Sequence, residues 1–233
     1  MAGNASAEVE YTLGTGYSSE YLFRGDNLGE DLVEASLSAS TEWNGLGLSA
    51  GAWYGSYDNG GAQRTEGDVD ELDLFAEVSK DLGFATAAVG YIYYMNEPYN
   101  LDDFQEVYVK FSRDLGFANA YAAYYWEIEG GLHNGDDFGD YSEIGLSRAF
   151  ELNQCLTLNL GTNIGYMWAD DQDTAWTTKA SLDWGFAENA KLSPFVAVAV
   201  QLTDDDDNYT GNGIGVDGFD NELIGGCMLS TSF

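Results

Sequence analysis

The stretch LTLNLGTNIGYMW, residues 156–168, alternates along its whole length. Its even-numbered positions, from Leu156 to Trp168, are almost all large and apolar, whereas the odd-numbered ones carry threonine, asparagine, glycine and one methionine. A period of two residues predicts a half-buried β-strand of about 13 residues. If the apolar side packs into a protein core, the chain is a soluble β-protein. If that side faces lipid, the chain is a membrane barrel with a wet interior.

The alternation recurs about a dozen times without an interrupting linker, which predicts a single domain over residues 1–233. A weak repeat supports a meander of hairpins: DELDLFAEVSKDLGFATAAVGYIYY from Asp70 matches DFQEVYVKFSRDLGFANAYAAYYWE from Asp103. The expected register places Ser79 opposite Phe84 in the first copy. The predicted strands are 8–24, 31–43, 46–57, 70–80, 84–95, 104–113, 117–128, 140–149, 155–168, 174–186, 191–203 and 220–233.

The connections between these strands alternate between short and long. Asn44-Gly45 is a strong signal for a two-residue hairpin, because both residues tolerate positive φ. The long connections are acidic and rich in glycine, and this asymmetry is typical of bacterial outer-membrane barrels. The predicted long connections are GDNLGED (25–31), DNGGAQRTEGDVD (58–70), NEPYNLDD (96–103), GGLHNGDDFGD (130–140), ADDQD (169–173) and DDDDNYTGNGIGVDGFD (204–220).

Aromatic residues on the apolar side gather near the two ends of the strands, as in the girdles of a lipid-facing barrel surface. We therefore predict an all-β fold, a transmembrane antiparallel up-and-down β-barrel of about 12 strands with short periplasmic turns and long acidic extracellular loops. A soluble lipocalin-like barrel or β-sandwich is the alternative. Toward the long connections lie Tyr21, Phe23, Tyr54, Tyr91, Tyr93, Tyr124, Trp126, Tyr166, Trp168 and Trp176; toward the short turns lie Trp43, Phe111, Trp184, Phe186 and Phe233.

The charge is strongly negative, with 40 acidic and 8 basic residues and a net charge of −32. Nucleic acid is therefore excluded as a partner, because its phosphates would be repelled. Many acids fall on the polar side of the predicted strands, where they would line the lumen. The acids expected there are Glu10, Glu20, Glu34, Glu42, Glu71, Asp73, Glu77, Glu106, Glu127, Glu143, Asp183 and Glu222, and the basic residues are Arg24, Lys110 and Lys179.

Four stretches resemble the TorF-type family of proposed outer-membrane porins: GYSSEYLFRG (16–25), ELDLFAEV (71–78), VGYIYY (89–94) and EVYVKFS (106–112). The most specific part is Tyr21-x-Phe23-Arg24-Gly25. The resemblance implies a β-barrel in the outer membrane and names no substrate. Arg24 and Glu20, four residues apart on the polar side of one predicted strand, are expected to form a structural ion-pair network near the barrel mouth, and a ligand contact is the alternative.

The residues give no sign of an enzyme or of a bound cofactor. The single histidine, His133, has no second histidine or cysteine at metal-ligand spacing. Cys155 and Cys227 are expected on opposite faces of strands that are not neighbours, so no disulfide is predicted. Asp204, Asp205, Asp206 and Asp207 are candidate ligands for a weakly bound divalent cation, and a solvated charge run is the alternative.

The predicted function is an outer-membrane porin-like channel for passive diffusion of small solutes, with a preference for cations. The alternative is a non-conducting structural or adhesive barrel. The expected partners are membrane lipid, lipopolysaccharide bridged by cations, and small solutes or cations, in a Gram-negative-type bacterium. Ala5-Ser6-Ala7 resembles the end of a removed secretory signal. Inward-pointing rings are the predicted obstacle in the lumen: Trp53, Phe75, Tyr108, Tyr125, Tyr141 and Phe195.

Overall fold

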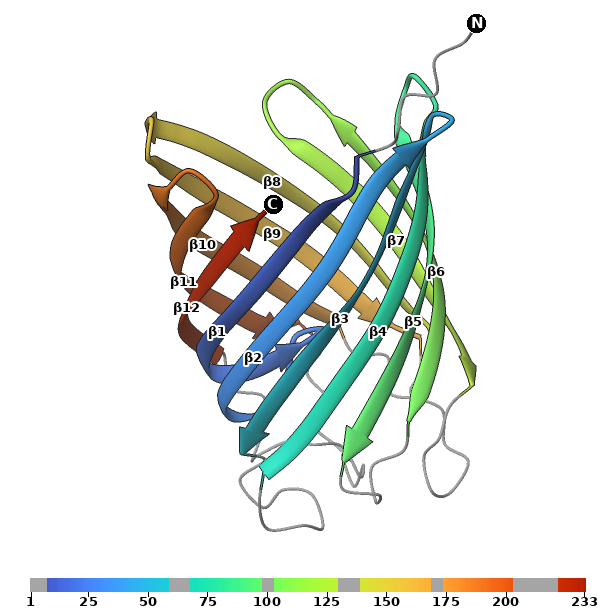
Figure 1. Cartoon of the computed structure of the whole chain (residues 1–233). Coiled ribbons are helices and arrows are strands. Elements are labelled where there is room, and N and C mark those ends of the chain that lie inside the picture. Colours follow the sequence, from blue (N-terminus) through green and yellow to red (C-terminus); the bar gives the residue numbers. More distant parts are fainter. Residues whose placement is uncertain (1–7, 59–67, 98–102, 130–138, 169–173, 203–221) are drawn as a thin grey trace, which may run out of the picture.

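The computed structural model describes residues 8–58, 68–97, 103–129, 139–168, 174–202 and 222–233, and these form a closed barrel of antiparallel strands (Figure 1). Each strand pairs with its neighbours in the chain, and β1 pairs with β12 to close the ring. The predicted up-and-down barrel is confirmed. The twelve strands are β1 (Glu10–Phe23), β2 (Asp26–Trp43), β3 (Leu46–Asp58), β4 (Asp68–Asp81), β5 (Thr86–Glu97), β6 (Phe104–Asp114), β7 (Asn119–Glu129), β8 (Tyr141–Asn153), β9 (Leu156–Met167), β10 (Thr174–Ala187), β11 (Ala190–Gln201) and β12 (Glu222–Ser232).

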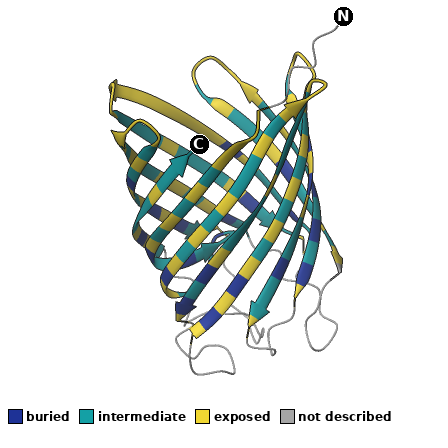
Figure 2. Ribbon diagram, viewed as in Figure 1, coloured by how far each residue is buried: buried dark blue, intermediate teal, exposed yellow. Residues whose placement is uncertain are grey.

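The apolar side of the strands faces outward, as predicted. Leu160 and Ile164 of β9 are exposed on the outer surface, whereas Asn159 and Asn163 make hydrogen bonds to Ser181 and Glu143 inside the barrel. Figure 2 shows the same alternation of exposed and covered residues along strand after strand. A continuous apolar outer surface of this kind is suited to lipid, and a water-soluble protein rarely exposes one. The described residues contain no helix long and apolar enough to cross a membrane.

Arg148 of β8 is an exception on the outer face, because it lies in register with Leu160 and is exposed. Its guanidinium donates a hydrogen bond of 2.6 Å to the carbonyl of Phe117, in the turn between β6 and β7. The side chain thus reaches toward the end of the barrel, with its guanidinium carbon 4.8 Å from the ring centre of Phe150.

Tight turns join the strands at one end of the barrel, which we call the short-turn end. Asn44 and Gly45 have φ of 52° and 74° and form the predicted two-residue hairpin. The turn of the first repeat hairpin has the expected four residues but lies two residues later than predicted, at Leu82–Ala85, where Leu82 donates to the carbonyl of Ala85. The predicted register of Ser79 with Phe84 is therefore wrong, and Ser79 pairs with Ala88. The partner of Ser79 is thus displaced by four residues along β5. Because this number is even, each side chain of the hairpin stays on the face where it was predicted.

The first hairpin differs from the prediction at the opposite end of the barrel, which we call the long-loop end. Residues 25–31 were expected to form a long acidic loop. Instead β1 and β2 stay paired as far as Phe23 and Asp26, and the turn between them is only Arg24 and Gly25, with φ of 55° and 103°. The prediction of a long loop here is wrong because the left-handed backbone at Arg24 and Gly25 lets the strands continue to a tight turn.

The end of this hairpin bends into the interior of the barrel (Figure 1). The register between β1 and β2 shifts at Tyr21/Leu22, and that between β2 and β3 shifts between Glu30 and Val33. Asp31 has a positive φ of 55° at the same level. Bulges of this kind bend a strand and re-aim its side chains. Tyr21 and Phe23, which we predicted in the outer aromatic girdle, accordingly lie inside the barrel.

Candidate functional site: an acidic lumen crossed by the first hairpin

The base of the inward hairpin is anchored by a small apolar core. Tyr21, Leu32, Tyr57 and Val69 are buried together, and Trp53 packs against them. The Tyr21 ring lies 4.9 Å from that of Tyr57 and 5.5 Å from that of Trp53. Burial of apolar side chains inside an otherwise wet barrel stabilises the bent conformation of the hairpin.

The tip of the hairpin is attached to the opposite wall by an ion pair. Arg24 Nη2 lies 2.5 Å from Glu106 Oε2 on β6, and the two side chains are only 7% and 0% exposed. Because β6 lies five strands around the ring from β1 and four from β2, the hairpin crosses the lumen. An ion pair with this little contact with water is screened far less by salt than a surface pair.

Aromatic rings surround the same guanidinium group. Its carbon lies 4.3 Å from the ring centre of Tyr141, 5.0 Å from that of Tyr125 and 4.8 Å from that of Phe23. The Tyr94 hydroxyl donates a 3.1 Å hydrogen bond to Glu106 Oε2. A guanidinium group stacks well on aromatic faces, so these rings add to the attraction of the carboxylate.

The predicted pairing of Arg24 with Glu20 is wrong. The bend at Tyr21/Leu22 takes Arg24 away from Glu20 and across the lumen to Glu106. Glu20 lies instead beside Glu222 of β12, so the two carboxylates face one another.

Beneath the hairpin lies a cavity of about 540 Å³, lined by acids, lysines and aromatic rings. Four carboxylates line it, Glu20, Glu34, Asp73 and Glu77, against the two ammonium groups of Lys110 and Lys179. The Trp53 indole donates to Glu34 over 2.7 Å, and the Tyr108 hydroxyl donates to Glu77 over 2.8 Å. Acidic groups therefore outnumber basic groups in the middle of the lumen.

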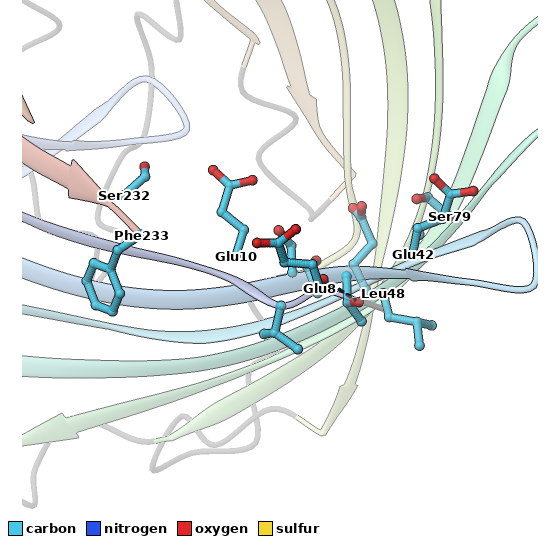
Figure 3. A pocket seen from close by; sticks show the side chains of 13 residues that line it. Glu8, Glu10, Glu42, Leu48, Ser79, Ser232 and Phe233 are labelled. Atoms are coloured by element: carbon cyan, nitrogen blue, oxygen red, sulfur yellow. Dashed lines mark hydrogen bonds between the residues drawn. The ribbon is translucent and has the colours of Figure 1, made fainter. Parts of the chain in front are cut away.

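A second cavity, of about 700 Å³, occupies the short-turn end (Figure 3). Glu8, Glu10 and Glu42 line it together with serine and threonine side chains, and no Lys or Arg is among the described residues that line it. Glu77 borders both cavities, so the two lie next to one another along the barrel. The lumen is thus acidic from the short-turn end up to the underside of the hairpin.

The other predicted lumen acids make their own hydrogen bonds or ion pairs inside the barrel. Glu71 is buried under the hairpin and accepts a hydrogen bond of 3.1 Å from Tyr21. Glu143 accepts one from Asn163, Glu127 accepts one from the backbone of Gly139, and Asp183 pairs with Lys191.

The lysines in the lumen lie over aromatic rings. Lys179 Nζ is 3.8 Å from the ring centre of Phe195, and Lys110 Nζ is 5.3 Å from that of Tyr121. Ring faces therefore stabilise these two ammonium groups.

Five of the six inward rings that were predicted to obstruct the lumen lie against glycines of its wall, and the sixth, Tyr125, packs 5.1 Å from the Tyr108 ring. A Cβ atom on Gly165 would meet the Tyr141 ring, and one on Gly51 would meet the Phe75 ring. The glycines leave space on the wall for these rings, so the rings line the lumen. Among the described residues, the segment that crosses the lumen is the first hairpin, which was not predicted.

No metal site is visible in the part of the chain that the structure describes. No three His, Cys, Asp or Glu side chains are grouped there as a metal ion would require. The candidate ligands Asp204, Asp205, Asp206 and Asp207 lie outside the described residues, as does His133. Cys155 and Cys227 are both free thiols.

A closed barrel with an apolar outer face and a polar interior has the fold of the outer-membrane porins and channels. Among solved structures, the COG4313 outer membrane channel from Pseudomonas putida F1 is similar, with a TM-score of 0.57 and 10% identity over 100% of this chain and 97% of that one. The KdgM porin has a TM-score of 0.55 with 12% identity, over 95% of this chain and 99% of that one. The NanC porin has the same TM-score with 16% identity, over 96% and 98%.

No protein-family model matches the sequence, and no curated protein matches it. The solved structures support a porin-like barrel but do not bear on the TorF-type resemblance in particular, which stays a prediction. At such low identities the likeness concerns the fold. The solute and the selectivity depend on the residues of this lumen.

Proposed function

We propose that this chain is a porin-like channel of the outer membrane of a Gram-negative-type bacterium, through which small solutes diffuse passively, cations in preference to anions. The observation that carries the proposal is the acidic lining of both cavities, where carboxylates outnumber ammonium groups. A confined passage lined by one sign of charge concentrates counter-ions and excludes co-ions.

The reversal potential across a planar bilayer under a KCl gradient tests this preference. We expect the sign of a cation-selective channel, with a smaller preference at high salt, where screening is stronger. A reversal potential near zero, or one of the opposite sign, would contradict the proposal.

The inward hairpin favours a second candidate, a non-conducting structural or adhesive barrel. It crosses the lumen and is held on both sides, by the apolar core around Leu32 and by the pair of Arg24 with Glu106. Single-channel recording separates the two candidates. Discrete conductance steps support the channel, and their absence in the wild-type protein and in Arg24→Ala supports the structural barrel. Binding of lipopolysaccharide through cations on the acidic loops stays a prediction, because these loops lie outside the described residues.

A further inference from the structure

The wall that receives Arg24 forms a cage that is built without the help of the hairpin. We call it the guanidinium cage, and it consists of Tyr94, Glu106, Tyr125 and Tyr141. These residues come from the adjacent strands β5, β6, β7 and β8. Their own contacts hold them: Tyr94 donates to Glu106, and the Tyr125 ring lies 5.8 Å from that of Tyr141. The cage would therefore keep its shape if Arg24 left it.

Arg24 does not use the full binding capacity of this cage. Glu106 is completely buried, yet its Oε1 atom has no hydrogen-bond partner among the described residues. Nη1 of Arg24 likewise has none there. A buried carboxylate oxygen without a donor is costly, and a guanidinium group satisfies a carboxylate best when it donates to both oxygens in parallel. A guanidinium group that is free of the hairpin backbone can adopt this geometry.

We infer that the guanidinium cage is a binding site for solutes that carry a guanidinium group, and that Arg24 occupies it as an internal ligand. A solute of this class competes with Arg24 and releases the hairpin tip from the wall. That release opens the lumen only if the proposed channel function is correct, whereas the binding itself does not depend on conduction.

The construction of the hairpin allows the tip to leave while the base stays in place. The apolar core around Tyr21 and Leu32 lies at the base, where the registers shift. Beyond it, Leu22 and Asn27 are only partly buried, and besides Arg24 the tip contacts the far wall through the Phe23 ring, which lies 5.9 Å from that of Tyr94 and 6.5 Å from that of Phe104. Because Arg24 is tethered, its effective concentration at the cage is high, on the order of millimolar. A free solute must therefore reach a similar or higher concentration to displace it.

Chemical rescue of Arg24→Ala tests the cage directly. The purified variant in detergent micelles is expected to unfold at a lower temperature than the wild-type protein. Guanidinium chloride should restore part of this loss, with half-saturation on the order of 10 mM for so small a ligand. Equal concentrations of sodium or ammonium chloride should restore less, because only guanidinium is planar and forked. The double variant Arg24→Ala/Glu106→Gln should show no rescue.

Lys191→Ala is the matched control, because it removes the exposed ion pair of Lys191 with Asp183, whose atoms are 2.8 Å apart. It should show no rescue by guanidinium. Rescue of this control, rescue of the double variant, or equal rescue by ammonium would each overturn the assignment. These measurements need no conductance, so the binding site can be confirmed even if the protein does not conduct.

A second measurement covers the case in which Arg24→Ala fails to fold. Asn27→Cys, in a background of Cys155→Ser and Cys227→Ser, places a thiol near the hairpin tip while Arg24 is retained. The rate of maleimide labelling should rise several-fold in tens of millimolar guanidinium chloride and stay constant in sodium chloride. An equal rate in the two salts would overturn the proposed competition with Arg24.

Discussion

The ring of Tyr108 on β6 lies over Gly90 of β5, the residue with which it is paired. Any side chain at Gly90 would meet this ring. The contact keeps the ring along the wall and leaves its hydroxyl in place to donate to Glu77. A residue without a side chain therefore helps to decide how wide the lumen is.

Gly90→Val should push the Tyr108 ring toward the middle of the lumen. We expect a destabilisation of about 1–3 kcal/mol, the usual effect of overpacking, and a lower single-channel conductance. Denaturant unfolding and bilayer recording measure the two effects. Gly161→Val is the control, because a Cβ there would meet only the carbonyl of Leu146, at 4.0 Å. Equal effects of the two substitutions would contradict this account of the lumen wall.

Leu37→Arg should impair folding into a bilayer. Leu37 is exposed on the outer face and is paired with Leu13 and Ala52, so a charge there has only apolar neighbours across the strands. The expected cost is about 2–4 kcal/mol near the bilayer midplane. Ser40→Arg on the same strand lines the short-turn cavity near Glu42 and should be tolerated. Folding yield into lipid vesicles is the measurement, and a greater defect in Ser40→Arg would reverse the assignment of the two faces.

Neutralising the middle of the lumen should weaken cation selectivity. The double substitution Glu34→Gln/Glu77→Gln leaves two carboxylates against two ammonium groups in the cavity beneath the hairpin. The reversal potential under a KCl gradient should therefore move toward zero. The control Glu151→Gln/Glu188→Gln changes exposed residues at the short turns and should have a smaller effect. If the control has the greater effect, selectivity is determined at the mouth.

Leu32→Ala should loosen the base of the inward hairpin. Leu32 is 5% exposed within the apolar core, so its truncation is expected to cost about 2–4 kcal/mol. A released hairpin should also make the current noisier. The neighbouring Val33 is 55% exposed on the outer face, and Val33→Ala should have little effect on either quantity. Unfolding measurements and current recordings on both variants check this. If Leu32→Ala changes neither the free energy of unfolding nor the current noise, the core does not hold the hairpin.

The strands and their faces were predictable because a lipid-facing strand has to alternate along its full length. Leu160 and Asn159 illustrate this, since a register error of one residue would have exchanged them between lipid and lumen. The tight turn at Asn44-Gly45 was predictable as well, because asparagine and glycine both adopt positive φ readily.

The inward bend of the first hairpin was not predictable, because neither its turn nor its register shifts leave a clear signal in the sequence. Arginine seldom adopts positive φ, so Arg24-Gly25 does not signal a turn, and the acids that follow resemble those of a surface loop. The bend depends on two register shifts, which alternation alone cannot reveal. One signal was present: Leu22, Phe23 and Leu28 are large apolar residues on both sides of the turn, which an exposed acidic loop would not need.

The seam between β1 and β12 has a consequence for the order of folding. It joins positions as distant in sequence as Thr12 and Ser232, and it ends in paired backbone bonds between Tyr11 and Phe233. Contacts of such large sequence separation carry the greatest loop-closure entropy and form slowly. Until they form, β1 and β12 present unpaired amides and carbonyls, which hydrocarbon cannot satisfy. The partly assembled sheet should therefore remain in water or at the membrane surface, and should enter the bilayer core only as the seam between β1 and β12 closes.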